Sequence, residues 1–120
     1  MTSPSARRCL VLGVLVALAV PTTALGHTGV SKRYPKPGTT ISKGPKTVYV
    51  TFSQRILGGA KFTVKRRGKV LMRGRNDRRH PNRVIGKRTK RLPSGVYRVS
   101  WSARSLDGHK LTGRWSFRVR

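Results

Sequence analysis

Three histidines and two aspartates hold most of the chain's capacity to bind a metal ion. Asp107 and His109 are separated by Gly108 alone. Residues two apart share a face of an extended strand, and in a tight turn both side chains can converge on one ion. Copper(II) favours nitrogen and oxygen donors in a tetragonal plane. The pair is therefore a candidate for half of a copper(II) site.

The same residues allow a simpler interpretation. Asp-Gly is a common hairpin signal, and here it lies between two runs of alternating apolar residues. Asp107 would then serve only to form a turn, and His109 would be an exposed strand end. Against this interpretation stands the composition, because a chain with no glutamate keeps an aspartate beside a histidine. Both interpretations stay open from the sequence.

The first 26 residues have the pattern of a signal peptide. Arg7 and Arg8 precede an apolar run over residues 10–20, which is too short to span a bilayer. Small residues at Ala24 and Gly26 suit a cleavage site. We expect residues 1–26 to be removed on export to the periplasm, the cell surface or the medium. A retained membrane anchor and twin-arginine export are the alternatives.

Cleavage after Gly26 makes His27 the first residue of a mature domain over residues 27–120. A terminal histidine offers two nitrogens, the free amine and the ring, which can chelate one metal ion. One more imidazole and a carboxylate would complete a copper(II) plane. The alternative is that a histidine follows the cleavage site by chance.

The remaining reactive side chains carry less information. His80 follows two arginines and is expected to be solvated, with a weak second metal site as the alternative. Met72 is expected in the core, and one thioether makes a poor copper(I) site. Cys9 leaves with the signal peptide, so no disulfide is expected. No hydrolytic constellation or paired carboxylates are present, and we expect no enzyme activity.

The composition predicts a strongly basic surface. The chain has 28 lysines and arginines against two acids, a formal net charge of +26. Such a surface attracts polyanions without sequence specificity, so no specific nucleic acid is expected as a partner. A cationic cell-surface module that binds anionic polymers or nucleic acid is thus the second functional hypothesis.

The elements that must position these residues are predicted to be strands. Apolar and polar residues alternate over 47–52, 61–65, 97–104 and 114–120, and shorter strands are plausible at 70–73 and 84–85. The rest of 73–91 is expected to be an exposed basic loop. Short strands with frequent turns predict an all-β fold, a Greek-key, immunoglobulin-like sandwich or barrel, with Trp101 and Trp115 facing inward.

The closing part of the chain resembles the CopC-type copper-resistance proteins. The residues that carry the resemblance are Leu92-Pro93, Gly95, Tyr97, Val99, Trp101, Ser105, Asp107-Gly108-His109, Gly113, Phe117 and Val119. The front of the mature domain fits as well, with His27, Pro35, Pro37-Gly38, Pro45 and the strand from Val48 to Ser53. Leu106, where a small residue is more usual, and the basic middle of the chain depart from the pattern.

The resemblance implies a Greek-key β-sandwich and a histidine-brace copper(II) site. Its ligands would be the amine and ring of His27, the carboxylate of Asp107 and the ring of His109. It also implies a copper carrier that works with a CopD-type membrane copper transporter. A copper-brace oxidase of polysaccharides is a third hypothesis, but such enzymes need a larger domain with a broad substrate face.

Overall fold

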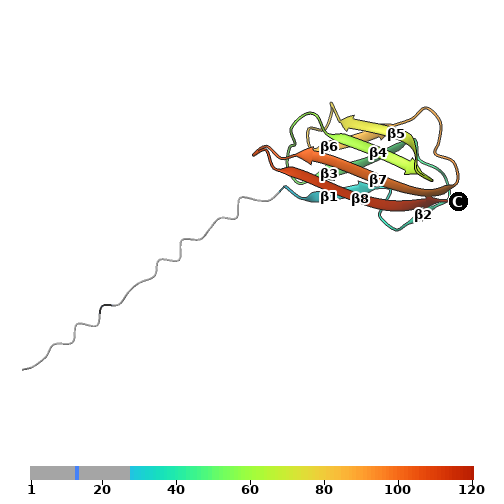
Figure 1. The fold of residues 1–120 in the computed structure, drawn as a ribbon, viewed down its shortest axis with the longest axis horizontal. Helices are drawn as coiled ribbons and strands as arrows, with labels where there is room; N and C mark the ends of the chain where they lie inside the picture. The colour runs from blue at the N-terminus through green and yellow to red at the C-terminus, as the bar shows by residue number, and fades with distance from the viewer. Residues whose placement is uncertain (1–12, 14–27) are drawn as a thin grey trace, which may run out of the picture.

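The fold is built from eight strands in a single sheet (Figure 1). The computed structural model describes residues 13 and 28–120, so His27 and the predicted signal peptide, apart from Gly13, lie outside the described residues. The strands are β1 (Val30–Tyr34), β2 (Thr40–Ile41), β3 (Thr47–Phe52), β4 (Lys61–Arg66), β5 (Lys69–Asn76), β6 (Arg83–Lys87), β7 (Gly95–Arg104) and β8 (Lys110–Val119). Among the described residues, no helix has the length and hydropathy needed to cross a bilayer.

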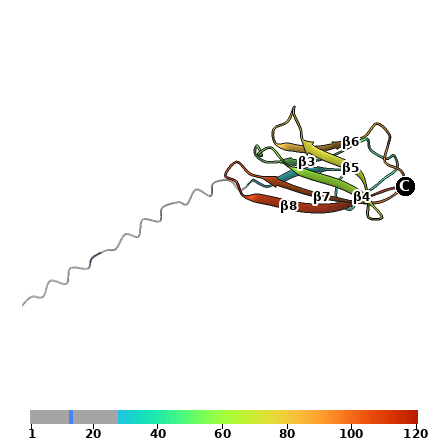
Figure 2. The same ribbon diagram turned by 45° about the horizontal axis from the view of Figure 1, so that its top comes forward.

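The strand order is β1-β3-β6-β5-β4-β7-β8-β2. Strands β4, β5 and β6 follow one another as hairpins, and β3 lies beside β6, which is a Greek-key arrangement. The sheet curls, so that its two ends approach each other (Figure 2). A hydrogen bond joins these two ends: the indole N–H of Trp115 on β8 donates to the carbonyl of Pro35, just after β1, at 2.9 Å. The predicted all-β, Greek-key fold is confirmed.

The core follows from the alternation along the strands. In β7 the side chains of Tyr97, Val99, Trp101 and Ala103 are buried, and the intervening residues face outward. Trp101 packs edge-on against Phe52 of β3, with ring centroids 5.0 Å apart. The two layers of the curled sheet are joined by such contacts, which bury the apolar stripe that the sequence pattern predicts.

The exposed loop expected over 73–91, apart from Val84 and Ile85, is wrong in part: residues 77–82 and 88–91 do lie outside strands, but the others belong to β5 and β6. Strand β5 continues to Asn76, and β6 extends from Arg83 to Lys87. The inward positions of these strands hold Gly74 and Gly86, which face each other across the pair. A Cβ atom at Gly74 would lie 2.6 Å from the Phe62 ring. The sequence of β5 and β6 therefore shows no clear apolar alternation, because glycines occupy inward positions and make room for side chains from other strands.

Strands β1 and β2 were not predicted from the sequence. Strand β1 is mostly polar, and its register with β3 shifts between Val30 and Lys32, so its residues do not alternate cleanly. Strand β2 has two residues and pairs parallel with the end of β8. Both strands form by pairing with residues that are distant in the sequence. Neither has a local alternation of apolar and polar residues that would predict it.

Candidate metal centre

Asp107 and His109 lie in the turn that joins β7 to β8, the longest hairpin of the sheet. The amide of Gly108 donates to the carbonyl of Ser105 at 2.9 Å, and the amide of Ser105 donates to the carbonyl of His109 at 3.0 Å. Gly108 has a φ of 85°, a conformation that suits glycine. The turn geometry thus fixes Asp107 and His109 on one tight corner.

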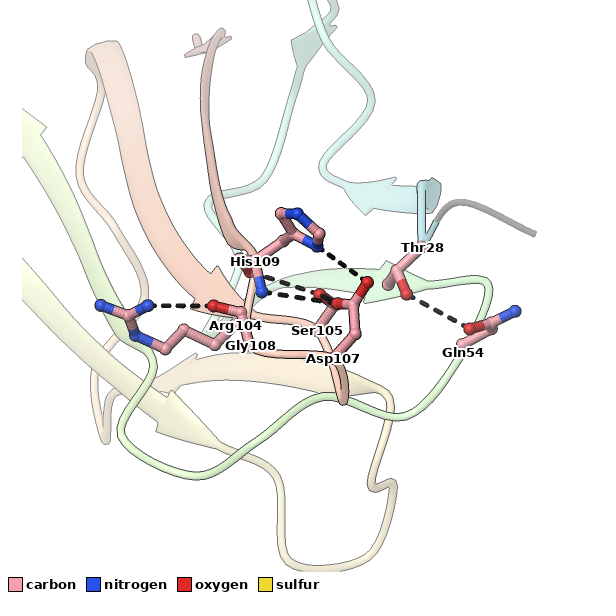
Figure 3. Close-up of polar contacts among 7 residues, drawn as sticks. All are labelled: Thr28, Gln54, Arg104, Ser105, Asp107, Gly108 and His109. Carbon is pink, nitrogen blue, oxygen red and sulfur yellow. Dashed lines mark hydrogen bonds and ion pairs between the residues drawn. The ribbon is translucent and has the colours of Figure 1, made fainter. Parts of the chain in front are cut away.

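The carboxylate of Asp107 is held from two sides (Figure 3). Its Oδ1 atom accepts a hydrogen bond from the hydroxyl of Ser105, a residue that is only 5% exposed. Its Oδ2 atom lies 2.8 Å from Nδ1 of His109. A residue that only formed a turn would need neither contact, so the corner orders a carboxylate against an imidazole.

This environment favours the charged form of the carboxyl group. Hydrogen bonds from the Ser105 hydroxyl and from His109 lower the pKa of Asp107 to about 2. The side chains of Asp107 and His109 are nevertheless 65% and 80% exposed. An ionised oxygen donor and a ring nitrogen therefore stand together at a surface that an ion can reach from solvent.

The start of the described domain is held at the same end of the sheet. The amide of Ser53 donates to the carbonyl of Gly29 at 2.8 Å, and Thr28 donates to Gln54 at 3.3 Å. Ile56, three residues after Ser53, forms an isolated bridge with Ser105. Residues 53–57 therefore connect the beginning of the domain to the β7–β8 turn, and Figure 3 shows Thr28 at this end.

Two residues contribute to this corner without having been assigned a role from the sequence. Ser105 positions the carboxylate of Asp107, and Arg104 donates from Nη1 to the carbonyl of Gly108 at 3.1 Å. The sequence carries a signal for Ser105, because this serine is one of the residues in the closing motif that resembles the CopC-type proteins. No comparable sequence signal points to Arg104.

The third histidine has a partner as well. His80 was expected to be solvated; its side chain is 50% exposed, but Nδ1 lies 3.1 Å from Oδ2 of Asp77. Asp77 also accepts from the amide of Arg79 at 2.9 Å. Both acids of the chain are thus paired with a histidine. The Asp77–His80 pair lies in the β5–β6 turn, at the same end of the sheet as Asp107, because Ile56 donates to the carbonyl of Pro81 in that turn and forms a bridge with Ser105.

Within the part of the chain that the structure describes, no group of three histidine, cysteine or acidic side chains converges. The corner supplies two donors, Asp107 and His109. Two of the four donors expected of the site, the amine and ring of His27, belong to a residue outside the described range. Met72 is 3% exposed and lies in the core, as expected.

Comparisons with known proteins agree on one family. The model of the CopC domain matches residues 30–120. Protein YobA of Escherichia coli strain K12 is 30% identical over 115 residues, which cover 87% of this chain and 92% of that protein. Copper resistance protein C of Escherichia coli is 25% identical over 128 residues, covering 94% and 96%. The crystal structure of CopC from Methylosinus trichosporium OB3b has a TM-score of 0.69 at 21% identity, over 78% of this chain and 93% of that one.

Proposed function

Because the chain belongs to the CopC domain family, we propose that it is an exported copper(II)-binding protein that carries or buffers the ion without transforming it. The proposed ligands are the amine and ring of His27, the carboxylate of Asp107 and the ring of His109. A relative named for copper resistance supports copper as the cargo. Delivery to or from a CopD-type membrane copper transporter is part of this proposal.

The spacing of the two described donors supports a copper(II) plane. Metal bonds to imidazole nitrogen and carboxylate oxygen are about 2.0–2.2 Å long, so two donors at right angles around one ion stand roughly 2.8–3.1 Å apart. Oδ2 of Asp107 and Nδ1 of His109 are 2.8 Å apart. Both atoms can therefore reach one cupric ion that lies to the side of the line joining them, once the hydrogen bond between them is broken.

The position of Thr28 is the observation that carries the proposal. Thr28 directly follows His27 in the chain, and it lies at the end of the sheet that carries the β7–β8 turn. A site made from both ends of the domain needs this arrangement. Had the first described residues lain at the opposite end, beside Arg120, an amino-terminal chelate with Asp107 and His109 would have been geometrically excluded.

The intact mass of the secreted protein, with and without one equivalent of copper(II), tests the proposal. We expect a chain that begins at His27 and a single copper adduct that survives dilution. Electron paramagnetic resonance of the same sample should show a tetragonal ion with nitrogen donors. A chain that begins elsewhere yet binds copper(II) equally well would refute the amino-terminal chelate.

A further inference from the structure

The outward surface of β4, β7 and β8 forms a basic hollow at the end of the sheet opposite the metal corner. Its volume is about 980 Å³. Four cations line it, Lys65, Arg67, Arg98 and Arg114, together with the hydroxyls of Ser100 and Ser116. The three strands lie side by side on the near face in Figures 1 and 2. We refer to this feature as the basic hollow.

The strand register arranges cations and hydroxyls in two adjacent rows. In one row, Lys65 on β4 pairs with Arg98 on β7, which pairs with Ser116 on β8. In the next row, Ser100 lies between Thr63 and Arg114. Neighbouring strands are about 4.8 Å apart, and residues two apart along a strand are roughly 6.7 Å apart. Donors therefore recur at short, regular intervals over the floor of the hollow.

Among the described residues, no acidic side chain pairs with these cations. In residues 28–120 both ion pairs between side chains use histidine, and none uses a lysine or an arginine. Lys65, Arg98 and Arg114 are exposed and donate no side-chain hydrogen bond to any described residue. Both aspartates lie in turns, outside the lining of the hollow. The donors are therefore free to bind an external anion.

The turn between β4 and β5 adds an independent observation. Arg67 has a φ of 50° and Gly68 a φ of 77°, so the two central residues of this hairpin are both left-handed. Asparagine is the favoured residue at the first of these positions, and a long side chain is uncommon there. The chain instead places a guanidinium at this position, and that guanidinium lines the hollow.

We propose that the basic hollow binds a linear polymer of phosphate groups. Guanidinium groups form paired hydrogen bonds with tetrahedral oxyanions, and neighbouring hydroxyls supply further donors. A concave floor suits a chain better than a flat membrane. Binding of single-stranded nucleic acid usually adds stacking on exposed aromatic rings, but the one aromatic residue in the lining, Trp115, is only 6% exposed.

The hollow and the metal corner are separate sites on the same strands. Arg98 and Arg104 are six residues apart on β7, a distance of roughly 20 Å at the rise of an extended strand. Asp107 lies beyond Arg104, in the turn. Polymer in the hollow would thus leave the copper ligands free. This inference stands independently of the proposed copper function.

Fluorescence anisotropy of end-labelled inorganic polyphosphate with the secreted protein tests the proposal. The test variant is Lys65→Gln/Arg98→Gln/Arg114→Gln. The matched control, Lys43→Gln/Lys46→Gln/Lys90→Gln, removes the same number of charges from exposed loops at other positions. We expect the test variant to bind at least about tenfold more weakly than the control. The slope of log affinity against log salt concentration should also become shallower by about two.

A third variant separates binding from folding. Arg67→Asn places a residue suited to its φ, so the fold should be at least as stable as before. Its affinity for polyphosphate should nevertheless fall several-fold, because a phosphate contact is lost. Copper(II) binding, measured in parallel, should not change in any of these variants.

Three results would overturn the proposal. Equal weakening in the test and control triple variants would show that net charge, rather than the hollow, attracts the polymer. Tighter binding of single-stranded oligo(dT) than of polyphosphate, at equal phosphate concentration, would assign the face to nucleic acid. Tighter binding to phosphatidylglycerol vesicles, lost in the test variant, would assign it to a membrane.

Discussion

The Oδ2 atom of Asp107 lies 2.8 Å from Nδ1 of His109, across a turn in which Ser105 holds the other carboxylate oxygen. These contacts make the pair more ordered than two exposed side chains usually are. They also keep the carboxylate ionised far into the acid range, because the pKa of Asp107 is lowered to about 2. An ordered oxygen and nitrogen donor at one corner are what a copper(II) chelate requires from the protein.

An added alanine before His27 should abolish tight copper(II) binding. The extension converts the terminal amine into an amide, which removes one donor and moves the positive terminus away from the ring. The dissociation constant, measured by competition with a chromophoric chelator, should rise by at least the 10–100-fold range typical of losing even an outer-shell partner. Enzymatic removal of the alanine should restore it. Unchanged affinity in the extended protein would refute the chelate.

His109→Ala should weaken copper(II) binding strongly, whereas His80→Ala should leave it unchanged. Both substitutions remove an imidazole that contacts an aspartate, at 2.8 Å and 3.1 Å respectively. The two variants are thus matched in chemistry and differ in place. Titration followed by electron paramagnetic resonance should show loss of a nitrogen donor for His109→Ala alone. Equal effects of the two substitutions on copper(II) affinity would contradict a site in the β7–β8 turn.

Ser105→Ala should weaken copper(II) binding by about tenfold or more, although Ser105 is not a proposed ligand. Without the hydroxyl, the Asp107 carboxylate loses a hydrogen bond that orients it and lowers its pKa. Copper affinity should then fall at a higher pH than in the unmodified protein. Ser116→Ala, an exposed serine on β8, is the control. A Ser105 variant with normal affinity and normal pH profile would leave the serine a purely structural role.

Asp77→Asn should destabilise the fold at neutral pH by about 1 kcal/mol. Burial acts to raise the pKa of Asp77, but the amide of Arg79 and the contact with His80 outweigh it and lower the pKa. A group whose pKa is lowered by folding stabilises the fold above its unfolded pKa, near 3.9, and loses this effect as the pH falls further. The difference in unfolding free energy between the two proteins should therefore shrink below about pH 4. A constant difference down to pH 2 would contradict this prediction.

Gly74→Ala should destabilise the domain by roughly 1–3 kcal/mol, as overpacked cores do. The new Cβ atom would lie 2.6 Å from the Phe62 ring and 2.7 Å from the backbone oxygen of Ile85. Gly58→Ala is the control, because no atom lies within 4 Å of the Cβ position there. Chemical denaturation should report a lower midpoint for the first variant alone. Equal midpoints would mean that β5 and β6 are not packed as described.

The alternating stripes were sufficient to predict the strongest strands. The runs around Val50, Val64, Val99 and Phe117 became β3, β4, β7 and β8, because a half-buried strand needs an apolar side chain at every second position. The family resemblance at the closing motif is likewise confirmed. The assignment of His27, Asp107 and His109 as ligands stays a prediction.

Tertiary packing decided the middle of the chain. Inward positions at Gly74 and Gly86 are filled by Phe62 and Met72 from elsewhere in the sheet, so no local pattern could reveal β5 and β6 in full. The same holds for β1, whose polar residues are ordered by pairing with β3.

The sequence by itself determined which donors exist and that Asp107 and His109 are close, because two residues in one turn cannot separate. It could not place Thr28 relative to that turn, nor align Lys65, Arg98 and Ser116 into a row. Those relationships join residues far apart in the chain, and they depend on strand order and register. Register is set when the whole sheet buries its apolar face, so it is a property of the folded domain rather than of any segment.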